Sequence, residues 1–284
     1  MSQPRPDPFT LPEWHALRRE ASLVSQLIGS GVTALGRASY ANGFGEYYTA
    51  FFGLSIGIER LAKLILTADH AIEHGGALPD QVVVKKFGHK LMALIEKADQ
   101  IATKHGLALE YPKPADSICW AAVDCLDAFA DASKGRYANF EQIGNPAFDP
   151  NNEPVNRWWI NVVELILDKH YRGKSAEVGV RERAAIIDAM TGSASFVLHI
   201  NEQGAMMTNV ATASERTGQT EWAQKYGRFY TLSVVRWLSN IFDRLVREAA
   251  HGKNIDALFG HNEFFTTYQV SDSFLLTRKL WPLK

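Results

Sequence analysis

The chain has 284 residues, of which 46% are hydrophobic and 21% are charged, and its formal net charge is −1. This composition allows a full-sized core in one or two domains and excludes global disorder. A charge so close to zero excludes a general basic coat for nucleic acid, so any contact with RNA or DNA requires a local basic patch. No run of 18 apolar residues occurs, so we expect no membrane span.

The N-terminus and the two cysteines indicate the compartment. Residues 1–13 are rich in proline and polar residues and lack the apolar middle of a signal peptide, so we expect an N-terminal arm and a cytoplasmic location. Cys119 and Cys125 share one predicted helix. Their Cα atoms would lie about 9 Å apart, too far for a disulfide, so we expect two buried thiols in a reducing compartment.

Helical periodicity extends over nearly every patterned segment, and no segment alternates convincingly as a strand does. The predicted fold class is therefore all-α, a helical bundle. Gly75-Gly76 and Gly106 are the clearest helix ends. The expected helices span residues 17–41, 47–74, 85–105, 116–133, 155–171, 181–190, 195–213 and 226–251, and an aromatic-rich tail over 258–281 should dock on the body.

Proline and asparagine cluster between residues 145 and 154, where Asn145-Pro146, Asp149-Pro150 and Pro154 break any helix. We predict a boundary here. It divides the chain into a helical half with an N-terminal arm, residues 1–144, and a second helical half with the aromatic tail, residues 145–284.

The helix expected over 226–251 is the most informative element, because apolar residues share one side and polar residues the other. Asn240, Arg244, Arg247 and His251 are spaced i, i+4, i+7 and i+11, which places them along one line. Arginine holds a phosphate with a rigid charged fork, and histidine can move a proton near neutral pH.

This pattern suits RNA cleavage without a metal ion. Arg244 would bind the scissile phosphate and His251 would act as general acid or base, with Asn240, Asp243 and Arg247 orienting them. The alternative is a polar helix face that makes salt bridges to acids of the same chain, as in most amphipathic helices.

Other motifs are weaker. His70 and His74 in His-Ala-Ile-Glu-His match the pattern of inverted zinc peptidases, but a solvated helix end explains them as well. Glu59 and Lys63 form an i,i+4 pair typical of helix surfaces. Phosphate loops, dinucleotide fingerprints, nucleophile elbows and paired Cys-x-x-Cys motifs do not occur, and we expect neither a metal nor a cofactor.

Three segments in the first half resemble domains of the HEPN superfamily. They are Phe-Phe-Gly-Leu-Ser-Ile-Gly-Ile-Glu-Arg-Leu-Ala-Lys-Leu (51–64), Phe-Gly-His-Lys-Leu-Met-Ala-Leu (87–94) and Gly-Arg-Tyr-Ala-Asn-Phe (135–140). They follow one another in the expected order, and the resemblance covers about residues 44–144. It therefore concerns roughly a third of the chain.

The resemblance implies a small α-helical bundle. Many HEPN domains are RNases of toxin–antitoxin or anti-phage systems, and others only bind nucleotides or RNA. Catalytic members carry an R-x4–6-H motif and usually build the site between two units, which implies a homodimer here and a protein antitoxin or regulatory partner. Arg244 and His251 fit this spacing. They lie outside the resembling stretch, and Leu245 stands where a polar residue usually follows the arginine.

Within the resembling stretch, supporting or RNA-binding roles are implied for Glu59, Lys63, His89, Arg136 and Asn139. His89 follows a helix break at Gly88 and could lie near a helix N-terminus, which favours an anion. Arg136 follows Gly135 and could reach the same place, or instead cap the carbonyls of the preceding helix.

A second hypothesis from the sequence is a non-catalytic helical module that binds a protein, RNA or nucleotide partner. In this interpretation the HEPN-like half is a scaffold and the aromatic tail contacts the partner. Near-neutral charge and the departures from the R-x4–6-H pattern favour it.

Overall fold

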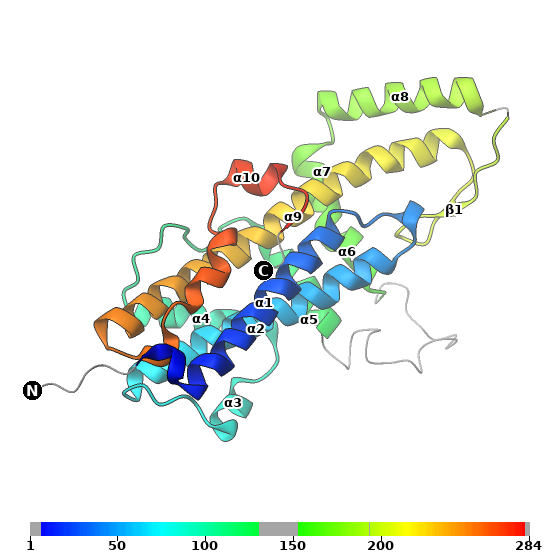
Figure 1. Ribbon diagram of the computed structural model, residues 1–284. Helices are drawn as coiled ribbons and strands as arrows, with labels where there is room; N and C mark the ends of the chain where they lie inside the picture. Colours follow the sequence, from blue (N-terminus) through cyan, green and yellow to red (C-terminus); the bar gives the residue numbers. More distant parts are fainter. Residues whose placement is uncertain (1–6, 131–152, 193, 282–284) are drawn as a thin grey trace, which may run out of the picture.

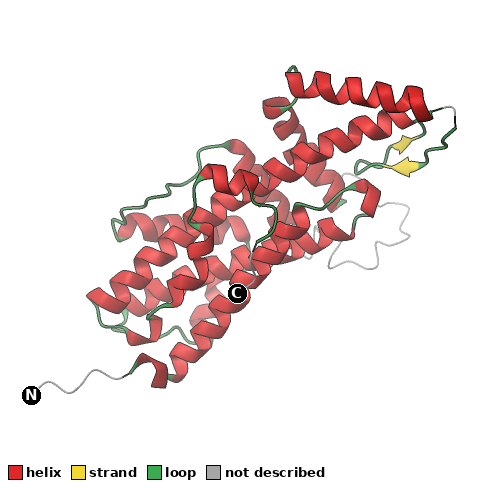
Figure 2. Ribbon diagram, turned by 45° about the horizontal axis from the view of Figure 1, so that its top comes forward, coloured by secondary structure: helices red, strands yellow, loops and turns green. Residues whose placement is uncertain are grey.

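The computed structural model describes residues 7–130, 153–192 and 194–281, and the predicted all-α class is confirmed (Figures 1 and 2). The only strands in these ranges are two residues each, β1 (His199–Ile200) and β2 (Met206–Met207). The α-helices are α1 (Pro12–Leu35), α2 (Gly45–Glu73), α3 (Gln81–Phe87), α4 (Leu91–Lys104), α5 (Ser117–Ala130), α6 (Pro154–Trp158), α7 (Glu164–His170), α8 (Ser175–Thr191), α9 (Val210–Arg247) and α10 (Asp272–Thr277). Two π-helical turns, Trp159–Val163 and Glu248–Gly252, continue α6 and α9, and 3-10 turns lie at Pro8–Thr10, Tyr40–Asn42, Asp256–Leu258 and His261–Tyr268.

Helices α1 and α2 pack side by side at unusually close range (Figure 1). Glycines allow this contact because they have no Cβ atom, although they lower helix propensity. A Cβ atom at Gly53 would lie only 2.8 Å from the carbonyl oxygen of Leu27. At Gly57 it would lie 2.6 Å from Cγ1 of Ile28. Gly53 and Gly57 of α2 are therefore packing residues, and so is Gly31 of α1, where a Cβ atom would lie 2.9 Å from the backbone nitrogen of Leu54.

Helix α9 runs along most of the molecule and packs against α1, α2, α5, α7 and α8 (Figure 1). Buried side chains from both predicted halves, such as Leu54, Trp158, Trp237 and Phe242, belong to one continuous core. The two halves thus bury apolar surface against each other. The division at residues 144 and 145 stays a prediction, and the junction lies outside the described residues.

The helix predicted over residues 195–213 is wrong. The chain instead forms a hairpin in which His199 pairs with Met207 and Ile200 with Met206, and Gly204 in its turn has φ +78°. Helix α9 then begins at Val210, well before the expected Tyr226. The Asn209 side chain caps it by accepting a hydrogen bond from the backbone N–H of Thr212 at 2.8 Å.

The helix predicted over residues 85–105 is two helices, because Gly88 has φ +82° and ends α3 before α4 begins. The predicted ends at Gly75-Gly76 and Gly106 are confirmed, and all three glycines have positive φ.

The aromatic tail docks on the body as predicted, with Phe265, Tyr268 and Trp281 buried. Cys119 and Cys125 are buried free thiols, and burial raises the pKa of each to about 12. Across the described ranges, no helix combines the length and apolar character needed to cross a membrane.

Candidate functional site

Two of the five site residues predicted on the helix over residues 226–251, Asn240 and Asp243, are buried and form hydrogen bonds with other segments of the chain. Asn240 accepts a hydrogen bond from the backbone N–H of Tyr111 at 3.1 Å and donates one to Gln269 at 3.2 Å. Asp243 accepts a hydrogen bond from the Asn262 amide at 2.6 Å. These contacts attach the segment before α5 and the C-terminal tail to α9, so both polar groups are satisfied inside the protein.

The other three residues differ in how they are paired. Arg247 donates from Nε to Asp243 at 3.0 Å, although 57% of its side chain is exposed. Arg244 is half-buried, its Nε is shielded from solvent, and it forms no ion pair with any residue the structure describes. His251 is exposed and contacts the ring of Phe259 edge to face, at 6.0 Å between centroids.

The π-helical turn Glu248–Gly252 changes the predicted alignment, because its i→i+5 bonds widen the helix just before His251. The straight line of four residues expected on a regular helix therefore bends between Arg247 and His251. No hydrogen bond joins Arg244 to His251 within the described structure. The two residues lie about two helical turns apart on one continuous helical segment.

A second cluster joins three residues that the HEPN resemblance singled out. Lys63 Nζ lies 2.6 Å from Glu59 Oε1, and His89 Nδ1 lies 3.1 Å from the same oxygen. The predicted Glu59–Lys63 pair is confirmed, and both side chains are about four-fifths buried, whereas 86% of the His89 side chain is exposed. This Glu59 cluster combines a carboxylate, a cation and an accessible imidazole.

The Glu59 cluster lies in a cleft of about 390 Å³ between α1, α2 and the end of α3. Arg60 and Glu20 form an ion pair at 2.6 Å in the same cleft, and Phe87 closes one side. The neighbouring N-terminus of α4 is already occupied, because the Leu91 N–H donates to Asp127 at 2.5 Å. The first N–H of that helix is thus not available to an anion beside His89.

The remaining predicted residues are placed as follows. Arg136 and Asn139 lie outside the described residues. His70 and His74 stack on each other with centroids 3.9 Å apart at the exposed end of α2. No group of three or more histidine, cysteine or acidic side chains with metal-ligand spacing occurs in the described part of the chain.

One polar cluster was not anticipated from the sequence. His105 at the end of α4 is nearly buried between two carboxylates, with Asp69 on α2 at 2.7 Å and Glu248 at 3.4 Å. Lys104 pairs with Asp69 at 2.8 Å. Residues of α2, α4 and the π-helical turn meet only in the folded chain, so no local sequence pattern predicts this contact.

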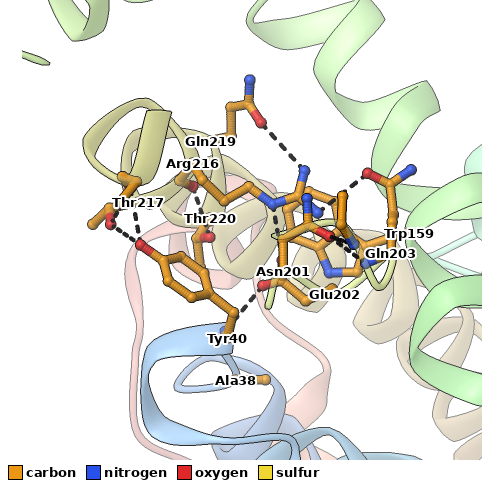
Figure 3. Close-up of polar contacts among 12 residues, drawn as sticks. Ala38, Tyr40, Trp159, Asn201, Glu202, Gln203, Arg216, Thr217, Gln219 and Thr220 are labelled. Atoms are coloured by element: carbon orange, nitrogen blue, oxygen red, sulfur yellow. Dashed lines mark hydrogen bonds and ion pairs between the residues drawn. The ribbon is translucent and has the colours of Figure 1, made fainter. Parts of the chain in front are cut away.

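A buried ion pair under the hairpin was also missed (Figure 3). Arg216 on α9 donates from Nε to Glu202 at 2.8 Å, and the guanidinium lies 3.4 Å above the Trp159 ring. The Glu202 carboxylate also accepts from the Tyr40 N–H at 3.1 Å and the Tyr47 hydroxyl at 3.3 Å. Burial and the Glu202 charge raise the pKa of Tyr47 well above its usual value, so its hydroxyl stays protonated and donates.

This buried pair connects the hairpin turn to α9, α2 and the π-helical turn before α7. Both carboxylate oxygens and all three guanidinium nitrogens of the pair have partners, which is the arrangement that a buried charge requires. We interpret it as the structural attachment of the hairpin. The sequence did not predict this pair, because residues 195–213, which include Glu202, were expected to form a helix.

Comparison with known proteins identifies no relative: no family model, curated protein or solved structure matches the chain. The HEPN resemblance therefore stays a prediction.

Proposed function

We propose that this protein binds RNA and cleaves it without a metal ion, as a HEPN-type ribonuclease in which Arg244 and His251 are the reacting pair. One observation carries the proposal. The sequence left open whether the polar stripe of α9 is neutralised by acids of the same chain. Arg247 is neutralised in this way, whereas Arg244 and His251 have no such partner among the described residues.

The chemistry requires a fixed positive charge and a proton carrier. The Arg244 guanidinium would hold two oxygens of the scissile phosphate, and neutral His251 would take the proton of the adjacent 2′-hydroxyl. The 2′-oxygen then attacks phosphorus, the bond to the 5′-oxygen breaks, and that oxygen takes a proton from solvent. The products are a 2′,3′-cyclic phosphate and a free 5′-hydroxyl.

The Glu59 cluster has a supporting role in this proposal. Lys63 and the exposed His89 ring would contact the RNA backbone, while Glu59 orients both. No described contact links this cluster to Arg244, so it would bind a different part of the strand. The HEPN resemblance adds a homodimer and a toxin–antitoxin or anti-phage context to the proposal.

The test is cleavage of a labelled RNA by the purified protein in EDTA, with the ends of the products identified. His251→Ala and Arg244→Lys should each lower the rate by about 100-fold or more, because one loses the proton carrier and the other the guanidinium fork. His74→Ala removes another exposed histidine and should cleave at the wild-type rate. Wild-type cleavage by His251→Ala would overturn the assignment.

A second candidate function is a non-catalytic helical module that assembles with a second copy of the chain. It is favoured by α8, which buries Val180 and Ala184 against the body yet exposes Ile186 by 59% and Met190 by 77%. The adjoining hairpin segment exposes further large apolar side chains, namely Phe196, Leu198, Ile200 and Met206. Large apolar side chains exposed on neighbouring segments of the chain are typical of protein interfaces.

Light scattering across a range of protein concentrations tests this candidate. The wild-type mass should rise toward that of a dimer, and Ile186→Glu with Met190→Glu should keep the mass of a monomer. Both positions are exposed, so the charges should leave stability unchanged within about 0.5 kcal/mol. A monomeric wild type at all concentrations would contradict self-assembly.

A further inference from the structure

Three flat rings lie in a parallel stack on the side of α9 that faces α7. Trp222 and Tyr226 are one helical turn apart, with centroids at 5.6 Å and planes within 9°. His170, the last residue of α7, continues the stack at 3.6 Å from Tyr226, also within 9°. All three side chains are half-buried, so part of each ring remains accessible.

Hydrogen bonds and an ion pair hold this stack in place. The Tyr230 hydroxyl lies 2.7 Å from Nε2 of His170, which fixes the plane of the imidazole. Lys169, the neighbouring residue on α7, forms an ion pair with Asp116 and lies 5.6 Å from the centre of the Tyr230 ring. The His170 ring is therefore held in its stacking orientation without a ligand, which lowers the entropic cost of binding.

Lysines surround the stacked rings. Lys225 Nζ lies 5.8 Å from the Trp222 centroid and 5.3 Å from that of Tyr226. Lys169 and Lys174 are exposed beside His170. Burial, together with the positive charges of these lysines, lowers the pKa of His170 to about 4, against the opposing effect of Asp116. At neutral pH the imidazole is thus an uncharged ring within a positive rim.

We propose that the stacked patch, formed by Trp222, Tyr226 and His170 with Lys174 and Lys225, binds single-stranded RNA. Bases of an unpaired strand expose flat faces that stack on aromatic rings, and lysines at the rim neutralise the phosphates between them. In a duplex the base faces are covered by neighbouring base pairs, so a duplex would make only the contacts between lysines and phosphates. The inference rests on the proposed function, for which it names the form of the substrate and a binding site separate from Arg244 and His251.

The experiment measures anisotropy of a fluorescent oligouridine in EDTA, with every variant made in a His251→Ala background so that cleavage does not interfere. Trp222→Leu with Tyr226→Leu should weaken binding about 10-fold or more, because the outer Trp222 ring and the ring on which it stacks are both lost. Tyr226→Phe keeps the ring and should bind within about twofold of the background protein. Thermal melts followed by circular dichroism establish that each variant is folded.

A second pair of variants separates the stacked patch from general charge. Lys174→Ala with Lys225→Ala should reduce the slope of log affinity against log salt by about 1.4, as expected for two phosphate contacts on a single strand. Arg19→Ala with Lys279→Ala makes the same change in net charge at two exposed positions outside the stacked patch and the Glu59 cluster, and should leave the slope unchanged.

The outcomes keep the two proposals distinguishable. Ring-dependent binding without any cleavage by the wild type would overturn the ribonuclease and support the stacked patch. Cleavage by the wild type, with equal RNA affinity in the leucine variant, the phenylalanine variant and the background protein, would overturn the stacked patch alone. Equal affinity for duplex and single-stranded RNA, or no RNA binding by the background protein, would also overturn it.

Discussion

The two halves of α9 differ in what covers them. Along residues 210–229 the helix is half-open: α8 lies on one side, and Trp222, Tyr226 and Phe229 remain partly exposed. Along residues 230–246 nearly every side chain is buried, including polar ones such as Ser239, Asn240 and Asp243. One continuous helix therefore serves as a surface element at one end and as a core element at the other.

The difference shows that the amphipathic pattern of a helix does not predict which other segments of the folded chain cover its polar side. In the C-terminal half, the tail folds back over that side, and Asn262 and Gln269 supply hydrogen bonds to Asp243 and Asn240. In the N-terminal half no comparable segment returns among the residues that the structure describes, and the hairpin is attached mainly through Glu202 and Arg216. The following substitutions test how each half is stabilised.

The largest effect is expected at the buried ion pair beneath the hairpin. Glu202→Ala leaves the Arg216 charge buried without its carboxylate, which should cost about 3–5 kcal/mol of unfolding free energy. Urea unfolding of this variant measures the loss. A double variant, Glu202→Gln with Arg216→Met, removes both charges and should recover part of it. A loss below about 1 kcal/mol in the single variant would mean that the hairpin is not attached through this pair.

A somewhat smaller effect is expected in the pH dependence of the unfolding free energy. It comes from His261, in the tail that covers the C-terminal half of α9. Burial lowers the pKa of His261 to about 4, below that of the unfolded chain. The unfolded state then binds more protons, so stability is fully present above about pH 6.5, falls with decreasing pH and levels off below about pH 4.

The contribution of His261 should reach about 3 kcal/mol at most over this range. His261→Gln removes the titrating group, and urea unfolding at several pH values should show a flatter profile than that of the wild type. His170, whose pKa is lowered in the same direction, adds a dependence that this variant retains. Identical profiles for the two proteins would contradict the assignment to His261.

The smallest of these effects is expected at Asn240. Asn240→Ala removes its hydrogen bonds with Tyr111 and Gln269 and leaves two half-buried partners unsatisfied, at a cost of about 1–3 kcal/mol. Thermal unfolding provides the measurement, with Ser233→Ala on the same helix as a control that loses only a hydrogen bond to its own helix. A neutral Asn240→Ala would show that the tail does not depend on this contact.

The sequence was informative about the candidate site only where its residues are close along the chain. Glu59 and Lys63 share a helix one turn apart, and their pairing was predicted from that spacing. The approach of His89 to Glu59 depends on the break at Gly88 and was not predicted, because the sequence analysis expected His89 beside a helix N-terminus. The stacked patch was not anticipated, because α9 was expected to begin only at Tyr226 and nothing local relates His170 to it.

Local properties were thus determined by the sequence itself. Periodicity established the all-α class, glycines marked the ends of α2 and α4, and apolar content accounted for the burial of the cysteines and of the tail's largest rings. The tertiary structure alone decided which polar residues of α9 are covered. Hydrogen bonds and ion pairs form between groups that folding brings together, and residues such as Asn240 and Tyr111 are too distant along the chain for any local pattern to join them.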